Sequence, residues 1–415
     1  MKIEKKDNNV EKLRNALLLL VRAGLWGQMS EDASALCLSD VEWNGVYRLS
    51  RQHTVTALAF HGLSLLPEDK FPPQALLIKW AAESDAVERR NIKMNGIIEQ
   101  LYNIYREKGL SPVLQKGQGI ATCYESPLQR ECGDIDLYFN NRIAWHIALS
   151  SLRKLHIKFA RQADKSICFK WQGFDIEYHR HLFDLYNPFL QSVVDKHEID
   201  KGYRYVMLSA ESSVCITVPS PFLDVLLQNL HILKHTISRG IGLRQMCDMA
   251  RTCYKLHGEI DAEEMRTVCK KLGLERWTSL LHAFMVDYLG LPIEYLPYKD
   301  KAPTAVPLAN IVWRGGNFGQ HDPSIAPDAN VFRRKLDTLQ SFMRNMRFAS
   351  YYAPKETFWY FIQLLKGQFC WLPLTIFVWQ TSTYRSVCQV RVILKNFFRR
   401  SVLSPYQTAM VRNCS

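Results

Sequence analysis

The stretch RECGDIDLYF, residues 130–139, places Asp134 and Asp136 on either side of one isoleucine in an otherwise apolar run. Alternate residues of a β-strand point to the same side, so a strand here directs both carboxylates one way, with Ile135 and Leu137 packed behind them. Two like charges held this close repel each other unless a cation lies between them, and hard oxygen ligands suit Mg²⁺. The pair therefore predicts a metal site. The alternative is a polar strand end with solvated aspartates.

The residues before this run predict a site for phosphate. VLQKGQG, residues 113–119, is a short strand that runs into Lys116 and Gly117 at the start of a helix. A glycine allows the backbone to approach a ligand closely, helix N-terminal amides favour anions, and Lys116 adds a point charge.

The residues after the run add a third acidic strand. FDIEYH, residues 174–179, alternates so that Asp175, Glu177 and His179 share one face of a strand. A site that holds two cations needs at least three carboxylates. The order of turn, paired aspartates and acidic strand is therefore what a two-metal phosphoryl-transfer site requires.

These motifs resemble a bacterial family of uncharacterised nucleotidyltransferases within the DNA polymerase beta superfamily. Members carry a strand ending in Lys-Gly, then Tyr, Pro and Arg, then Asp-Ile-Asp-Leu, then a Glu-Leu-His strand. The matching positions are Lys116, Gly117, Tyr124, Pro127, Arg130, residues 134–137 and residues 177–179. A His-rich helix and a Leu-Arg motif resemble LHILKH at 230–235 and GLRQMCDMA at 242–250. The wider superfamily has Gly-Ser at the phosphate turn, where this chain has Gly117-Gln118 and so lacks a hydroxyl.

The resemblance implies a role for each matching residue. Asp134 and Asp136 would bind both metals, Mg²⁺ or Mn²⁺, and Glu177 would complete one site and serve as the base. Lys116 and Gly117 would hold the triphosphate, and Arg130 would contact a phosphate or the transition state. Further expected substrate-binding residues are His179 and Arg244.

Two residue pairs on the predicted helices have more than one interpretation. Arg244 and Asp248 are four residues apart and most simply form an intrahelical salt bridge, with contact between Arg244 and the nucleotide as the alternative. His231 and His235 are expected to pack in the core or to line the cleft.

The expected fold is α+β, a polymerase-beta-like nucleotidyltransferase core with a small mixed sheet, flanked by N- and C-terminal helical domains. Apolar residues at three- and four-residue spacing predict helices before residue 109 and again after residue 218. The predicted units are an N-terminal helical region (1–108), the α/β core (109–218), a helical domain (219–296), a connector rich in Pro, Gly and Asn (297–330) and a basic helical C-terminal region (331–415).

Composition indicates where the protein works. Its 11 cysteines include no C-x-x-C pair, which is typical of reduced thiols in a cytoplasmic protein. No signal peptide or membrane span is expected. The net charge is +13, and residues 357–415 contain no Asp or Glu. A helix at 386–400 has an apolar and a basic face, which suits packing on the protein's own core or contact with an anionic membrane; contact with nucleic acid is a further alternative.

The sequence therefore predicts a metal-dependent nucleotidyltransferase that moves an NMP from an NTP, taken as ATP, to an acceptor and releases pyrophosphate. Members of the similar family often occur beside polysaccharide-synthesis genes, which suggests a sugar-related acceptor. The alternative is a non-catalytic, antitoxin-like protein that uses the same fold to bind a nucleotide or a partner.

Overall fold

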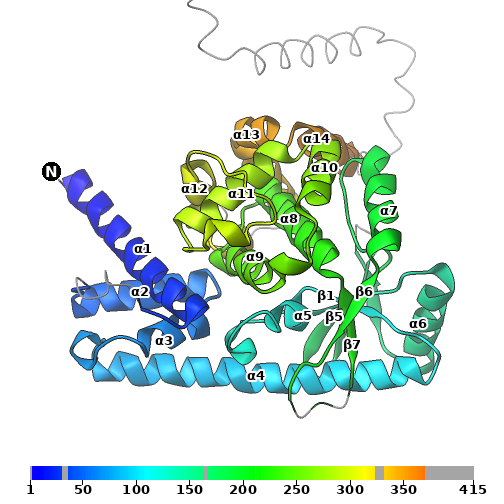
Figure 1. Cartoon of the computed structure of the whole chain (residues 1–415), viewed down its shortest axis with the longest axis horizontal. Helices are drawn as coiled ribbons and strands as arrows, with labels where there is room; N and C mark the ends of the chain where they lie inside the picture. The colour runs from blue at the N-terminus through cyan, green and yellow to red at the C-terminus, as the bar shows by residue number, and fades with distance from the viewer. Residues whose placement is uncertain are drawn as a thin grey trace, which may run out of the picture.

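The computed structural model describes residues 2–29, 36–162, 166–210, 212, 214–322 and 331–369. Four helices lead the chain: α1 (Lys2–Trp26), α2 (Asp40–Gln52), α3 (Thr56–Leu63) and α4 (Gln74–Arg106). Helix α4 has 33 residues and runs beneath both the other N-terminal helices and the sheet (Figure 1). It therefore joins the N-terminal part of the chain to the part that carries the acidic motifs.

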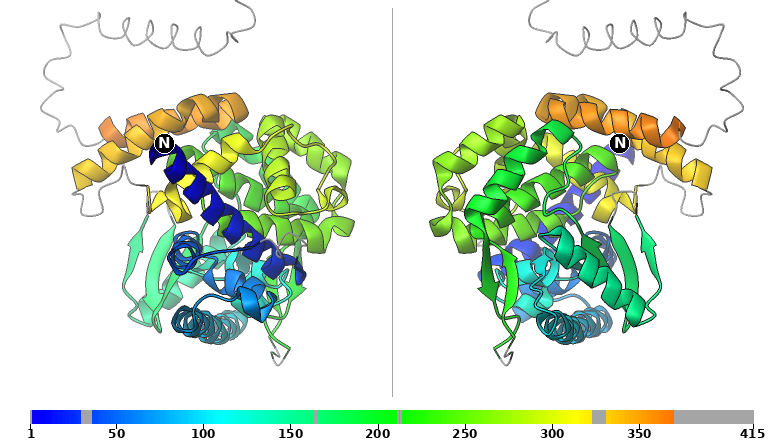
Figure 2. Two further views of the ribbon diagram at one scale, coloured as in Figure 1. Left: turned by 90° about the vertical axis from the view of Figure 1, so that its left-hand side faces the viewer. Right: turned by 90° about the vertical axis from the view of Figure 1, so that its right-hand side faces the viewer.

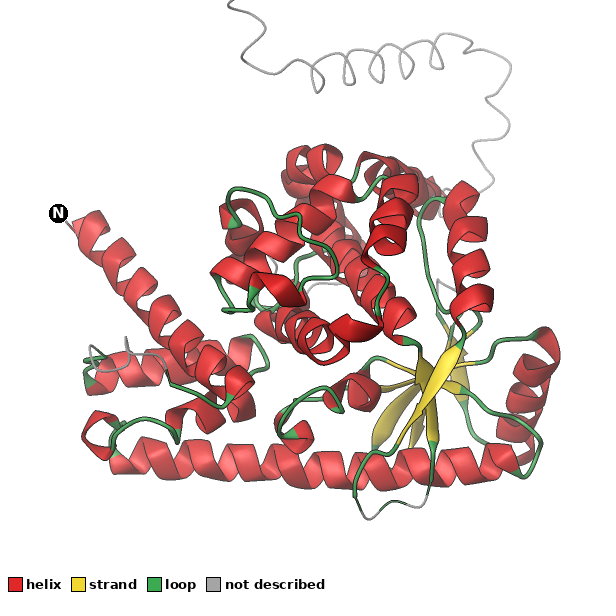
Figure 3. Ribbon diagram, in the orientation of Figure 1, coloured by secondary structure: helices red, strands yellow, loops and turns green. Residues whose placement is uncertain are grey.

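One mixed sheet of seven strands follows, with helices on both of its faces (Figure 3). The strands are β1 (Val113–Gln115), β2 (Ile135–Tyr138), β3 (Phe159–Arg161), β4 (Ile167–Trp171), β5 (Phe174–His179), β6 (Tyr203–Val206) and β7 (Ile216–Pro219), in the order β3-β4-β5-β2-β1-β7-β6. Strand β2 pairs parallel with β5 and antiparallel with β1, which pairs parallel with β7. Strands β1, β2 and β5 and the mixed pairing confirm the sequence prediction, and β3, β4, β6 and β7 complete the sheet.

The two faces of the sheet differ in character because side chains alternate along each strand. Ile135, Leu137, Ile176 and Tyr178 belong to one buried cluster, with apolar residues of α4 and of α6 (Arg142–Lys154). Figure 2 shows α4 end-on beneath the sheet. Since this face holds the core, the polar side chains of β2 and β5 project from the opposite face.

Helices cover that opposite face. They are the short α5 (Gly117–Ala121), α7 (Gln191–Lys201), α8 (Pro221–Ser238), α9 (Leu243–Leu256), α10 (Ala262–Leu272) and α11 (Glu275–Asp287). Further along the chain come α12 (Val306–Gly315), α13 (Val331–Tyr352) and α14 (Pro354–Phe369), and α13 and α14 lie at the opposite end of the molecule from α4 (Figures 1 and 2). The N-terminal helices share one large apolar cluster with these helices.

The predicted connector, residues 297–330, contains a helix. Helix α12 places Leu308, Ala309, Ile311 and Val312 in the interior. Its apolar residues fall at helical spacing, but the prolines and glycines on either side hide this pattern in the composition of the segment.

Arg251 on α9 ties α1 to the rest of the chain. Its side chain is 2% exposed and donates to the carbonyl oxygens of Leu25 and Cys123 at 2.8 and 3.0 Å, and to the Glu125 carboxylate at 2.9 Å. Arg22 and Trp26 of α1 also donate to backbone carbonyls at the end of α11 and just beyond it, at residues 287–289. The first helix is therefore an integral part of the helical body.

Some sequence predictions stay predictions. The helix-rich α/β architecture is present, but neither the polymerase-beta-like layout of the core nor the domain boundaries are tested by it. The amphipathic basic helix at 386–400 lies outside the described residues. Within the described ranges, no helix is long and apolar enough to cross a membrane.

Candidate active site

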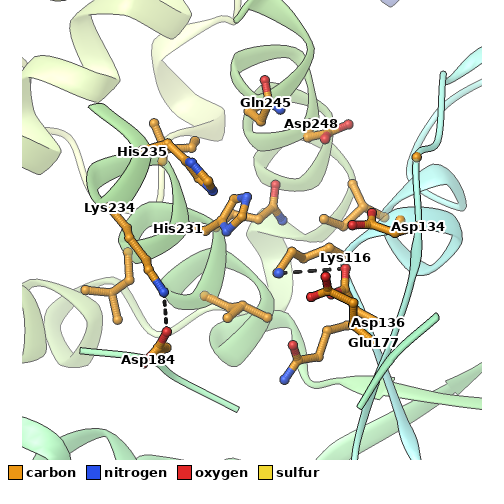
Figure 4. Close-up of a pocket in the computed structure, with 18 of the residues that line it drawn as sticks. Lys116, Asp134, Asp136, Glu177, Asp184, His231, Lys234, His235, Gln245 and Asp248 are labelled. Atoms are coloured by element: carbon orange, nitrogen blue, oxygen red, sulfur yellow. Dashed lines mark hydrogen bonds and ion pairs between the residues drawn. The ribbon is translucent and has the colours of Figure 1, made fainter. Parts of the chain in front are cut away.

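A cavity of about 320 Å³ lies between the polar face of the sheet and helices α8 and α9 (Figure 4). It brings together the sequence-predicted site residues, which are Lys116, Gly117, Arg130, Asp134, Asp136, Glu177, His179 and Arg244. Residues of α8 and α9 and Phe318 of the loop after α12 form the facing wall. The cavity therefore combines residues that are up to about 200 positions apart in the chain.

Asp136 lies at the centre of the sheet side. It is the register partner of Glu177 in the parallel pairing of β2 and β5, so both carboxylates leave the sheet on the same face. Asp136 is 5% exposed, and its Oδ1 lies 2.7 Å from Nε2 of His179. Its Oδ2 lies 3.7 Å from Nζ of Lys116.

The three carboxyl groups have different electrostatic environments. Burial alone would raise the pKa of Asp136, but Lys116 and the hydrogen bond with His179 outweigh it and lower the pKa to about 2. The charge of Asp136 raises the pKa of Asp134. Burial, followed by repulsion from Asp136, raises the pKa of Glu177. Of the three carboxyl groups, Asp136 thus loses its proton at the lowest pH.

One group of side chains among the described residues has the spacing of a metal site. A ligand atom each of Asp136, Glu177 and His179 lies within 4.8 Å of the others. Asp134 comes directly before β2, is exposed and lies outside this group, although it lines the same cavity. The geometry thus adds His179 as a candidate metal ligand. The metal-binding roles of Asp134, Asp136 and Glu177 stay predictions.

The Lys116-Gly117 turn has an unusual backbone. Both residues have positive φ, +50° and +46°, and a lysine rarely adopts this conformation. Such conformations persist where the surrounding structure enforces them and are common at ligand sites. Gln118, at the position where the superfamily that the motifs resemble has a serine, is 3% exposed; it donates to the Asn91 carbonyl and accepts from the Cys132 thiol. The amide group of Gln118 therefore makes its hydrogen bonds in the protein interior.

The predicted intrahelical salt bridge between Arg244 and Asp248 is wrong. Asp248 instead forms a bidentate ion pair with Arg130, with N–O distances of 2.8 and 2.6 Å, and accepts from Tyr124 Oη at 2.8 Å. All three side chains are buried. A local pair on an exposed helix contributes only about 0.2–0.5 kcal/mol, and a charge-assisted bidentate pair away from water is far stronger. Contact of Arg130 with a phosphate stays a prediction.

The facing wall holds the residues that the sequence did not reveal. His231 and His235 line the cavity, as one of the two sequence interpretations expected. Gln228, Lys234, Asp184 and Phe318 line it too, and none of them was among the predicted site residues. A lysine and two histidines at helical spacing in LHILKH were a usable signal for α8, whereas Phe318 lies in a glycine-rich loop whose position depends on tertiary contacts.

A cavity with carboxylates on adjacent strands, a lysine at a strained turn and a candidate metal group defines a candidate phosphoryl-transfer protein. Residues 39–290 match the model of a family described as uncharacterised nucleotidyltransferases, and the chain belongs to that family. This match confirms the resemblance to a nucleotidyltransferase family that the motifs indicated.

Two further comparisons add little. No curated protein matches the chain. Among solved structures, the chain is similar to an antigenic nucleotidyltransferase-like protein from Paracoccidioides brasiliensis, with 11% sequence identity and a TM-score of 0.30, over 50% of this chain and 94% of that one. This similarity is too low to carry an argument.

Proposed function

We propose that the protein is a metal-dependent nucleotidyltransferase that transfers an NMP from an NTP to an acceptor and releases pyrophosphate. The observation that carries this proposal is the register pairing of Asp136 with Glu177 on the polar face of the sheet, inside a cavity that Lys116 and Gly117 also line. Membership of the nucleotidyltransferase family supports the same reaction class.

The donor set fits a divalent cation. Asp136 is a buried carboxylate with a second carboxylate and an imidazole close by, and oxygen-rich sites of this kind suit Mg²⁺ or Mn²⁺. In the proposal, Asp134, Asp136 and Glu177 hold the metal, with His179 as a further ligand or as the hydrogen-bond partner that orients Asp136. A bound metal would neutralise charge on the phosphates and polarise the reacting phosphorus.

The chain's own residues then bind and orient the reactants. Lys116 places its charge beside the triphosphate, and Gly117 permits a close approach of the backbone because a side chain is absent. The oxygen of an acceptor hydroxyl forms a bond to the α-phosphorus, and the bond from that phosphorus to the bridging oxygen breaks. The pyrophosphate leaves with the electron pair, and the hydroxyl proton passes to Glu177.

Arg130 has a second role in the proposal, because its ion pair with Asp248 attaches α9 to the segment before β2. This contact fixes the distance between the two walls of the cavity, and a fixed distance keeps bound reactants in a reactive geometry. Arg130 also lines the cavity, where the resemblance gives it a phosphate contact.

The main experiment is incubation of the protein with Mg²⁺, a cell extract and NTPs that carry the label at either the α- or the γ-phosphate. The proposal expects the α-label to appear in a new product and the γ-label to appear in pyrophosphate. Asp136→Asn should abolish both signals. Transfer of the γ-label instead would identify a kinase. The antitoxin-like alternative would be supported if no NTP gave a product while the protein still bound nucleotide.

A further inference from the structure

The wall of the cavity that faces the carboxylates has its own chemistry. It is formed by α8, α9 and Phe318, and Figure 4 shows His231 directed toward Lys116 across the space between the walls. The sequence-derived roles account for the sheet side, and they leave most of this wall without a function.

Arg244 is the main charge on this wall. Its neighbour Arg130 takes both carboxylate oxygens of Asp248, so Arg244 has no carboxylate within ion-pair distance among the described residues. One of its terminal nitrogens donates to the Glu131 carbonyl at 3.1 Å, while its buried Nε has no hydrogen-bond partner. Withdrawing a charge from water without a partner is costly, so an anionic ligand would satisfy this group.

Two buried acceptors lie on the same wall. Gln228 and Gln245 are 3% and 5% exposed, and each uses its amide nitrogen on a neighbour, Thr252 and Asn317 respectively. The amide oxygen of each has no hydrogen-bond partner. Buried acceptors are normally satisfied, and both oxygens are closed off from the cavity in this structure, so a ligand hydroxyl would reach either one after a rotation of its side chain.

An aromatic surface completes the wall. Phe318 has φ of +51°, a conformation that is rare for a bulky residue, and its ring lies 4.4 Å from the His235 ring and 5.8 Å from the Arg244 guanidinium. Burial, with the charge of Lys116 next, lowers the pKa of His235 to about 3, and burial likewise lowers that of His231. Both imidazoles are therefore neutral near pH 7 and add ring surface and hydrogen-bonding atoms.

The wall is poorly suited to a cationic ligand. The two acids beside it are already paired, Asp184 with Lys234 and Asp248 with Arg130. A polycationic acceptor such as an aminoglycoside would meet Arg244 and Lys116 without a free carboxylate on this side.

We infer that this wall is the acceptor subsite and that the acceptor is a phosphorylated polyhydroxy compound, whose phosphate contacts Arg244 while its hydroxyl groups bind Gln228 and Gln245. That this compound is the acceptor of the reaction rests on the proposed function. That it binds to this wall is independent of the proposed function. In this arrangement the acceptor binds to the facing wall, and the triphosphate binds opposite it, to Lys116 and Gly117 on the sheet side.

Calorimetry with hexose phosphates, the unphosphorylated hexoses and a non-hydrolysable Mg·NTP analogue tests the inference. Wild type should bind at least one hexose phosphate, and the parent hexose at least about tenfold more weakly. Arg244→Gln should weaken hexose phosphate binding by about tenfold or more, the effect of one charge-assisted hydrogen bond, and change the affinity for the analogue by less than about twofold. Arg244→Lys should restore part of the affinity.

Arg266→Gln is the matched control, because Arg266 is exposed on α10 outside the cavity and its loss changes the net charge equally. Gln245→Leu should weaken binding of the hexose phosphate and of the hexose by similar factors. Thermal melting should show Arg244→Gln no less stable than wild type, since the variant removes an unpaired charge.

Three results would overturn the inference: no hexose phosphate binding to wild type at millimolar concentration, equal weakening of hexose phosphate and Mg·NTP analogue by Arg244→Gln, or binding of an aminoglycoside in preference to every hexose phosphate. The second would assign Arg244 to the triphosphate. Failure of the proposed function would appear separately, as absence of NMP transfer or of metal-dependent nucleotide binding in wild type.

Discussion

Asp136 on β2 and Glu177 on β5 are register partners in a parallel strand pair, and their carboxylates leave the sheet together toward α8 and α9. One ligand oxygen of each acid lies within 4.8 Å of the other, which is close enough for the two carboxylates to share a cation. The pairing also explains why Glu177, rather than the nearby Asp175, belongs to the site. Asp175 lies on the same face of β5 but pairs with Lys170 of β4 beyond the end of β2.

Asp136→Asn should lose affinity for Mg²⁺ and Mn²⁺, because a neutral amide is a poor substitute for the carboxylate with the shortest contacts in the candidate metal group. Calorimetry of the metal-free protein measures this. Asp175→Asn removes one carboxylate from the same sheet face and should bind the metal as wild type does. Equal metal affinity for Asp136→Asn and wild type would disprove the metal assignment.

Glu177→Gln should lower the turnover of NMP transfer by about 100-fold or more, since the amide has nearly the same shape but cannot accept the proton. The affinity for Mg·NTP should fall much less, because Lys116 and Gly117 are assigned to the phosphates. Transfer of the α-label under single-turnover conditions separates the two effects. Near-normal turnover would show that Glu177 is ordinary strand surface.

Arg130→Gln should lower the free energy of unfolding by about 3–5 kcal/mol, because it leaves the Asp248 carboxylate buried without its partner. Urea denaturation provides the measurement. Arg89→Gln breaks an exposed pair with Asp85, four residues earlier on α4, and should cost less than about 1 kcal/mol. If the two variants lost similar stability, the buried pair would not be what attaches α9 to the segment before β2.

His53 should make the protein less stable in acid. It is 1% exposed, and burial lowers its pKa from 6.5 to about 3. Between these values the unfolded chain binds more protons at this site, so the free energy of unfolding rises with pH and is lost as the pH falls from about 6.5 toward 3.

The His53 ring packs edge to face against the Trp313 ring, with 5.0 Å between the ring centroids. His53→Phe keeps a ring in this position and removes the group that titrates. The slope of unfolding free energy against pH should fall by up to about 1.4 kcal/mol per pH unit in this range. Denaturant titrations at several pH values measure the slope. An unchanged slope would mean that His53 is protonated in the folded protein.

The sheet side of the site could be predicted from sequence because strand alternation and short motifs are local. The i, i+2 spacing in DIDLYF and FDIEYH was enough to place Ile135 and Ile176 behind the sheet and Asp136 and Glu177 in front of it. The facing wall depends on which helix meets the sheet and at what angle. That choice is made by contacts between residues more than 100 positions apart, such as Arg130 with Asp248.

Local rules failed where burial overrode them. The i, i+4 rule paired Arg244 with Asp248, but it assumes a solvated helix face, and Asp248 is 4% exposed beside Tyr124 and Arg130. Composition alone assigned 297–330 to a connector and missed α12, whose glycine-rich end carries Phe318 into the cavity.

The contacts of Arg251 determine where the protein can be cut. The family match begins at residue 39, yet this guanidinium, which lies inside the matched region, takes one of its acceptors from Leu25 of α1. A fragment that starts at residue 39 would expose the apolar residues that α1 covers. It would also remove the Leu25 carbonyl, which is one of the hydrogen-bond acceptors of the Arg251 guanidinium. The smallest unit expected to fold on its own is therefore longer than the homologous region, and the extra length at its front is a structural requirement.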